Sequence, residues 1–252
     1  MNAFPIEDLG TPLAAWKHSS RLARLPVITP QRLVPTYARA VIVAPHPDDE
    51  VLGCGGLMQL LSQAGRPLQL ISVTDGSASH PGSSRWSAAR LSVIRPQESA
   101  AALRRLGLCM TRLKWIRGGF PDSQVSRRES SLAAFVQRYL RPGDVVFTTW
   151  RQDGHPDHEA VGRAVATAAA RVGAVVHELP IWAWNWLTPE DREFPWNRAC
   201  KVQLDIWSQA RKRHAVQAFV SQLAGDREAG LAPILAPHVL ERLLQPFELV
   251  LL

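Results

Sequence analysis

The sequence predicts an α/β fold with a mainly parallel sheet covered by helices on both faces, a Rossmann-like three-layer sandwich. Short apolar or β-branched runs alternate with helical stretches from Ala40 onward, which is the pattern of strand–helix–strand units. The 252 residues are 46% hydrophobic and 20% charged, a balance typical of a globular protein with a packed core. Three expected helices end at Gly65, Gly107 and Gly173, where a left-handed cap costs least.

The chain is predicted to comprise an N-terminal arm, residues 1–38, and one domain, residues 39–252. The arm contains several prolines and no clear period, and one short helix is expected near residues 13–25, docked on the domain. Strands are expected at residues 40–44, 68–74, 113–117, 144–150 and 174–182, with helices between them at 56–65, 98–107, 131–140 and 158–173.

Charge and cysteine usage bear on location and partners. The formal net charge of +7 is spread over the chain, which is typical of a solvated basic surface and leaves an anionic substrate, a phospholipid headgroup or nucleic acid as alternatives. No apolar run is long enough to span a membrane and no secretion signal is recognisable, so a cytoplasmic location is predicted. The three cysteines are far apart, so neither a disulfide framework nor a thiolate zinc site is expected.

Two loops at predicted strand ends carry the same unusual residues. The first reads HPDDE at residues 46–50 and the second reads HPDHE at residues 155–159. Helix capping explains one or two acids in such a turn, but it explains neither the histidine beside them nor the recurrence after a second strand. Because ligands of open α/β sheets bind outside the carboxyl ends of the strands, the two loops predict a shared metal ion there.

The residue types in these loops match the needs of a catalytic zinc ion. Such an ion takes three histidine or carboxylate ligands and leaves a fourth position for water, and His46, Asp49 and His158 supply that set. Bound zinc lowers the pKa of its water to about 7, and Asp48 is the candidate general base that collects the proton. As an imidazolium, His155 is expected to stabilise the oxyanion or protonate the leaving amine. The set predicts metal-assisted hydrolysis of an amide.

Acids close to His155 are expected to orient its ring. Asp153 and Asp157 each lie two residues away, so either is a candidate for this role. A dinucleotide site is not supported by the glycines at residues 53–56, because Met58 stands where a third glycine is required and the preceding acids would repel phosphate.

The sequence resembles the LmbE-like or PIG-L family of de-N-acetylases from about Ala40 to Gln222. Two motifs from the loops above carry most of the resemblance, AVIVAPHPDDEVLGCGG at 40–56 and DGHPDHEAVG at 153–162. Further matches are VTDG at 73–76, Arg95 with Glu98, GFPDS at 119–123, ARKRHAVQAFVSQ at 210–222 and a weaker QPFELV at 245–250. Because motifs and context agree, the joint match is highly specific.

This resemblance implies a zinc hydrolase that removes an N-acetyl or other N-acyl group from an N-acetylglucosamine-type sugar or sugar conjugate. It implies the same metal set, the same base and the same oxyanion histidine as the residues above, and a substrate contact for Arg95. It implies a small-molecule amino-sugar conjugate as partner; no nucleic acid is expected, and peripheral membrane contact, another divalent metal and the oligomeric state stay open. Phe219 and Val220 stand where relatives often carry a histidine, which bears on the substrate rather than on the reaction.

Other interpretations remain open from the sequence. The same metal could serve hydrolysis of another bond, such as a phosphoester, although phosphoryl chemistry favours two ions and more carboxylates. A non-catalytic basic binding protein on the same fold is a further alternative. The tryptophan-rich segment at residues 182–196 fits either half-buried anchors or a rim of flat faces for a sugar or lipid.

Overall fold

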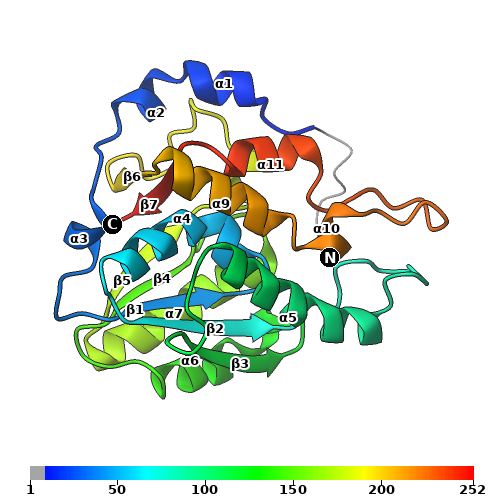
Figure 1. Ribbon diagram of the computed structural model, residues 1–252, viewed down its shortest axis with the longest axis horizontal. Coiled ribbons are helices and arrows are strands. Elements are labelled where there is room, and N and C mark those ends of the chain that lie inside the picture. Colours follow the sequence, from blue (N-terminus) through cyan, green and yellow to red (C-terminus); the bar gives the residue numbers. More distant parts are fainter. Residues whose placement is uncertain (1–8) are drawn as a thin grey trace.

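The computed structural model describes residues 9–252, which contain one seven-stranded sheet (Figure 1). Its strands are β1 (Ala40–Ala44), β2 (Leu68–Thr74), β3 (Lys114–Phe120), β4 (Val145–Thr149), β5 (Val175–Leu179), β6 (Ala199–Gln203) and β7 (Phe247–Leu251). The strand order is β3-β2-β1-β4-β5-β7-β6. The strands from β3 to β5 pair in parallel, whereas β7 runs antiparallel to both β5 and β6.

Helices cover both faces of this sheet. They are α1 (Leu13–His18), α2 (Ser20–Arg24), α3 (Pro30–Leu33), α4 (Asp49–Gln63), α5 (Ala88–Arg105), the 3-10 helix η1 (Val125–Arg128), α6 (Glu129–Gln137), α7 (Pro156–Val172), α8 (Ala183–Trp186), α9 (Ile206–Val216), α10 (Val220–Leu223) and α11 (Pro237–Leu243). Helix α9 packs against α4 and α5, and α6 packs against α7. Figure 1 shows α4 and α9 on one side of the sheet and α6 on the other.

The central strand β1 shows why its sequence is continuously apolar. Ala40, Ile42 and Ala44 belong to the hydrophobic cluster on the α4 and α9 side, whereas Val41 and Val43 belong to the cluster on the α6 and α7 side. All five side chains are buried. A strand of a parallel sheet covered on both faces needs apolar residues at every position rather than at alternate ones.

The sequence-based prediction of the α/β class with a mainly parallel sheet is confirmed. β1 and β2 have the predicted bounds, and β3, β4 and β5 lie within a few residues of theirs. The pair β6 and β7 was not predicted, because β6 includes Lys201 and Gln203 and β7 includes Glu248, so neither shows the continuous apolar run of the central parallel strands. The predicted glycine caps are present, since φ is +70° at Gly65, +83° at Gly107 and +76° at Gly173.

The described part of the N-terminal arm packs on the domain. It contains α1 and α2 rather than the single helix expected, because Ser19 ends α1 and its side chain accepts a hydrogen bond from Leu22 N at the start of α2. Trp16 is buried with its ring centroid 4.8 Å from that of Trp184. Trp16 and five further arm residues, Leu22, Leu25, Leu33, Val34 and Ala38, belong to the main core.

Sheet topology places two loops at one point. The chain leaves β1 through α4 toward β2, and it leaves the neighbouring strand β4 through α7 toward β5, on the opposite side of the sheet order. Divergence of two adjacent connections opens a crevice at the carboxyl ends of the two strands. The loops at residues 45–48 and 150–155 meet there. Among residues 9–252, no helix is long and apolar enough to cross a membrane.

Candidate active site

The loop after β1 makes a tight entry into α4. Asp48 precedes the helix with φ of 145°, a region that a non-glycine residue occupies at a cost of about 1–3 kcal/mol and that is concentrated at functional sites. Glu50 supports this conformation, because its Oε2 accepts a hydrogen bond from Asp48 N at 3.1 Å and its Oε1 accepts one from the Ser99 hydroxyl at 2.5 Å. The strained turn holds the carboxylates of Asp48 and Asp49 in the crevice, where both are buried.

The loop after β4 presents two histidines at the start of α7. His155 is the N-cap residue, and its Nδ1 accepts a hydrogen bond from Asp157 N at 3.2 Å. Pro156 occupies the first turn, where its missing N–H costs nothing. His158 is the third residue of α7 and is buried, with its ring centroid 4.6 Å from that of His155.

One carboxylate oxygen of Asp49 contacts histidines from both loops. Asp49 Oδ2 lies 3.2 Å from His46 Nδ1 and 3.3 Å from His158 Nε2. Ligand atoms about 2.0–2.1 Å from a tetrahedral zinc ion are separated from each other by about 3.3–3.4 Å. The structure thus brings Asp49 into contact with both histidines, although the groups of three described residues whose possible ligand atoms all lie within 4.8 Å of one another do not include Asp49.

Each of the two histidines has a carboxylate on its other ring nitrogen. His158 Nδ1 lies 2.6 Å from Asp153 Oδ2, and His46 Nε2 lies 3.3 Å from Asp157 Oδ2 and 3.4 Å from Asp122 Oδ1. A carboxylate behind the imidazole fixes the tautomer and the orientation of a metal-binding histidine. The surroundings of the pair thus fit the proposed ligands.

The electrostatics of the site favour a positive charge. Burial alone would lower the pKa of His46, but hydrogen bonds with Asp122, Asp157 and Asp49 raise it well above its usual value. Burial alone would likewise lower the pKa of His158, but Asp49 and Asp153 raise it to about 9. Carboxylates that stabilise a proton on these rings also stabilise a metal cation that takes its place.

Two overlapping groups in the described residues bring three ligand atoms within 4.8 Å of one another: His46 with His155 and His158, and His46 with Asp122 and Asp157. Both groups contain His46 and neither contains Asp49; the carboxylates of the second group lie on the Nε2 side of the His46 ring. In the first group, Nδ1 of His155 is already engaged by the N–H of Asp157.

Asp48 lies beside this centre and is held by Arg95. Arg95 Nη2 donates to Asp48 Oδ2 at 3.0 Å and to Pro47 O at 2.9 Å, and its Nη1 donates to Gly76 O at 2.8 Å. Burial raises the pKa of Asp48 and the Arg95 charge opposes the rise, which leaves it at about 7. A carboxylate with that pKa can accept and return a proton near neutral pH.

The pKa of His155 is lowered, whereas that of Asp48 is raised. Burial first, and then the neighbouring His158 and His46, lower the pKa of His155 to about 2. Since its Nδ1 accepts a backbone N–H, the proton of the neutral ring is on Nε2. The structure therefore favours a neutral hydrogen-bond donor at this position in place of the expected imidazolium.

The orienting acids contact other histidines than the one expected. Asp153 meets His158, and the side chain of Asp157 meets His46 rather than His155. Asp153 faces His158 because a distant segment holds its carboxylate. That carboxylate accepts hydrogen bonds from the backbone N–H groups of residues 181–183 at 2.8–3.0 Å.

Two functional candidates had no role assigned from the sequence. Asp122 lies on the loop after β3, and its Oδ1 is 3.4 Å from His46 Nε2. Its Oδ2 accepts a hydrogen bond from Ala78 N at 2.6 Å, which joins this loop to the loop after β2. Glu50 supports the strained Asp48 turn. The rule that ligands gather at strand ends also applies to β3 and could have identified Asp122.

The fold and this site define an α/β protein with a buried histidine–carboxylate centre at the ends of its parallel strands. A family model described as PIG-L, GlcNAc-PI de-N-acetylase, matches residues 41–169, slightly more than half of the chain. The chain belongs to the PIG-L family. The matched region includes every candidate site residue named above except the backbone donors at 181–183.

Known relatives of the chain are deacetylases. It is 30% identical over 140 residues to "Probable N-acetyl-alpha-D-glucosaminyl L-malate deacetylase 2" of Bacillus cereus, a match that covers 52% of this chain and 61% of that protein. It is 31% identical over 172 residues to 1D-myo-inositol 2-acetamido-2-deoxy-alpha-D-glucopyranoside deacetylase of Mycolicibacterium gilvum, which covers 58% of each. The chain thus spans about three fifths of the length of these relatives.

A solved structure confirms the architecture over a longer stretch. N,N'-diacetylchitobiose deacetylase from Pyrococcus horikoshii superimposes with a TM-score of 0.59 at 20% identity, covering 87% of this chain and 82% of that chain. At that identity the similarity concerns the fold alone.

Proposed function

We propose that this protein is a metal-dependent deacetylase that hydrolyses the N-acetyl or a related N-acyl group of an N-acetylglucosamine-type sugar or sugar conjugate. The main support is the contact of one Asp49 oxygen with His46 and His158, next to the Arg95-held carboxylate of Asp48. Family membership and the amino-sugar deacetylases among the relatives support the same reaction.

His46, Asp49 and His158 would hold the metal, with zinc as the first choice and another divalent ion as the alternative. When bound, the metal would polarise the amide carbonyl and make water acidic enough to attack at neutral pH. Asp153, Asp157 and Asp122 would orient the two histidine ligands from behind.

Asp48 would carry the proton through the reaction. In the first step its carboxylate takes a proton from water while the oxygen of that water forms a bond with the acyl carbon. In the second step the protonated Asp48 returns the proton to the amide nitrogen while the C–N bond breaks. The products are a carboxylic acid, acetate for an N-acetyl group, and the free amine of the sugar.

His155 would stabilise the negative charge that develops on the acyl oxygen. Its Nε2–H is the free donor of the ring, because Nδ1 is engaged by the N–H of Asp157. A donor that is fixed by the helix start before the reaction needs no reorganisation when the charge appears, which is the basis of oxyanion stabilisation.

The phosphoester alternative has less support. Both groups of potential metal ligands among residues 9–252 require His46, so they do not offer two separate sites, whereas phosphoryl transfer by metals favours two ions about 3.5–4 Å apart. A non-catalytic binding protein would not need the strained φ of 145° at Asp48. A cytoplasmic location and the division into an arm (1–38) and a catalytic domain (39–252) remain predictions.

The test is an assay on the purified full chain. Metal content is measured first, and acetate and phosphate release are then compared across N-acetylglucosamine, its lipid-linked and nucleotide-linked forms and short chitin oligomers. We expect metal-dependent release of acetate, abolished by a chelator and restored by zinc. Release of phosphate without acetate would support the phosphoester alternative, and salt-dependent binding to nucleic acid without turnover would support the binding protein.

A further inference from the structure

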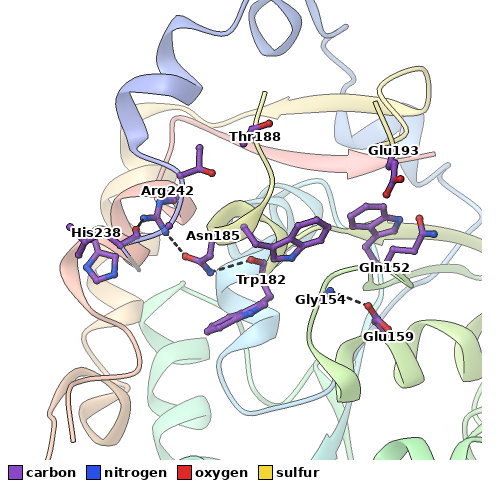
Figure 2. A pocket seen from close by; sticks show the side chains of 14 residues that line it. Gln152, Gly154, Glu159, Trp182, Asn185, Thr188, Glu193, His238 and Arg242 are labelled. Carbon is purple, nitrogen blue, oxygen red and sulfur yellow. Dashed lines mark hydrogen bonds between the residues drawn. The ribbon is translucent and has the colours of Figure 1, made fainter. Parts of the chain in front are cut away.

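A cavity of about 810 Å³ lies beside the loop that carries His155. This volume is within the range of about 300–1,000 Å³ typical of ligand pockets. Three tryptophans line it, Trp150, Trp182 and Trp186, together with polar side chains that include Gln152, Glu159 and Glu193. Figure 2 shows Trp182 and Asn185 on one part of the wall and Gln152, Glu159 and Glu193 on another.

The aromatic wall is attached to the catalytic loop. Trp186 Nε1 donates to Asp153 O at 2.8 Å, and the indole lies against Gly154, where φ is +84° and an added Cβ would come within 2.3 Å of Trp186 Nε1. Glycine is therefore required at position 154 for the tryptophan to lie on the loop. This close approach fixes the indole one residue before His155.

The cavity and the candidate metal centre also share a support. The Asp153 carboxylate contacts His158 and accepts the N–H groups of residues 181–183, at the start of the tryptophan-rich segment. Trp182 lies between the two regions, with its ring centroid 6.1 Å from that of His155 and its plane tilted by 79°. Trp182 lines the cavity and lies beside His155, so the cavity begins about one side chain away from the candidate metal centre.

Tryptophans of this segment divide into two roles. Trp184 is buried against Trp16 and serves as an anchor. Trp186 is 47% exposed and lies nearly parallel to Trp150, at an angle of 7° with centroids 6.5 Å apart. Trp184 thus matches the anchor interpretation, whereas the exposed face of Trp186 is available to a ligand.

The polar side chains of the cavity indicate which class of ligand it can bind. The carboxylates of Glu159 and Glu193 repel anions, and they lose hydration without compensation beside an alkyl chain. The guanidinium of Arg242 also lines the cavity; its Nη atoms donate to Asn185 Oδ1 and Leu9 O, and its buried Nε has no partner among the described residues. A sugar ring suits both parts of the wall, since its C–H face packs on an indole and its hydroxyls donate to carboxylate and amide oxygens.

We infer that this cavity binds a second, uncharged sugar ring of a glycan whose N-acetylated residue reaches the candidate metal centre. The inference rests on the proposed deacetylase function and adds the substrate class, an N-acetylated glycan of two or more rings.

The experiment compares N-acetylglucosamine with N,N'-diacetylchitobiose on the full chain. We expect kcat/KM for acetate release to be at least tenfold higher for the disaccharide, and Trp186→Ala to reduce this ratio at least fivefold. Trp207→Ala is the matched control, because Trp207 is 74% exposed on α9 and does not line the cavity. It is expected to keep the wild-type ratio.

A second pair of variants avoids the contact of Trp186 with the catalytic loop. Glu193→Ala removes a carboxylate of the cavity and is expected to reduce the preference for the disaccharide, whereas Glu190→Ala, on the same segment but outside the cavity, is expected to keep it. Metal content of each variant is measured, so that a general loss of the site is recognised.

Calorimetric binding measurements test the sugar site separately from the proposed deacetylase reaction. In an Asp48→Asn background, the disaccharide is expected to bind at least fivefold more tightly than the monosaccharide, and Trp186→Ala to abolish the difference. Equal preference in wild type and Trp186→Ala, or a preference for an alkyl glycoside over the disaccharide, would overturn the sugar site while acetate release still supports the deacetylase. Selective disaccharide binding without acetate release would support the sugar site and overturn the proposed reaction.

Discussion

Arg95 and Asp48 form a buried ion pair, with Nη2 and Oδ2 at 3.0 Å and side chains only 3% and 8% exposed. The arginine also bonds to the carbonyl oxygens of Pro47 and Gly76, so it connects the strained turn after β1 with the loop after β2. Resemblance to the family implied a substrate contact for Arg95. That contact stays a prediction; in the structure the guanidinium holds the candidate base, and we propose that Arg95 is a positioning residue in the mechanism.

Arg95→Lys separates these two roles. A lysine keeps the charge but cannot bridge the three oxygens in a fixed plane, and loss of a charge-assisted hydrogen bond costs about 1.5–3 kcal/mol. We expect kcat to fall about 10-fold to 100-fold with KM nearly unchanged, measured by steady-state acetate release. The control is Arg117→Lys, whose pair with Asp75 lies on the surface. A large rise in KM at unchanged kcat would instead indicate direct substrate contact.

Asp48→Asn tests the proposed base. Asparagine has a similar shape and keeps an oxygen for Arg95, but it cannot accept a proton from water. We expect activity to fall by about 10²-fold to 10⁴-fold, the usual contribution of a general base, while the metal content stays that of the wild type because Asp48 is not a proposed ligand. Acetate assay and metal analysis on the same preparation provide the check. Activity equal to wild type would exclude this role for Asp48.

The candidate site was predictable to the extent that it depends on local sequence. Two HPD motifs each follow a parallel strand, and adjacent strands bring their ends together, so the meeting of His46, Asp49 and His158 follows from strand order. Apolar runs buried on both faces likewise made the parallel strands recognisable.

Partners that depend on distant segments could not be predicted. Asp153 contacts His158 because three backbone N–H groups at residues 181–183 fix its carboxylate, and nothing near Asp153 in the sequence indicates them. β6 was missed for another reason, because Lys201 and Gln203 interrupt its apolar pattern although it pairs with β7 along its whole length. The neutral state of His155 depends on burial, which the residue type does not reveal.

Asp153→Asn tests the support behind the proposed metal ligand. The amide replaces one of the two oxygens that accept N–H groups and no longer stabilises charge on the His158 ring. Loss of such a contact typically lowers metal affinity about 10-fold to 100-fold. Competition with a chelator measures the affinity, and Asp191→Asn, which removes a carboxylate that caps Thr188 away from the metal centre, is the control. Unchanged affinity in Asp153→Asn would contradict the proposed role of His158.

His177→Phe tests a dependence of stability on pH that arises outside the metal centre. His177 lies on β5, its ring packs against Phe147 with centroids 5.4 Å apart, and its Nδ1 is buried without a partner in the described residues. Burial first, and then the charge of Arg198, lower the pKa of His177 from 6.5 to about 4. The unfolded chain therefore binds a proton more readily than the folded protein, and stability falls as the pH drops below about 6.5.

The size of this effect follows from the two pKa values. Between pH 7 and pH 5, protonation of His177 in the unfolded chain lowers the free energy of unfolding by about 2 kcal/mol, and the loss is complete only below pH 4. We expect His177→Phe to lose about 2 kcal/mol less than wild type over this interval in urea titrations at both pH values. The substitution leaves the residues of the candidate metal centre unchanged, so the pH dependence of that centre is expected to cancel in the comparison. His214→Phe, at an exposed position of α9, should follow the wild type, and an equal loss in His177→Phe would show that another group causes the acid sensitivity.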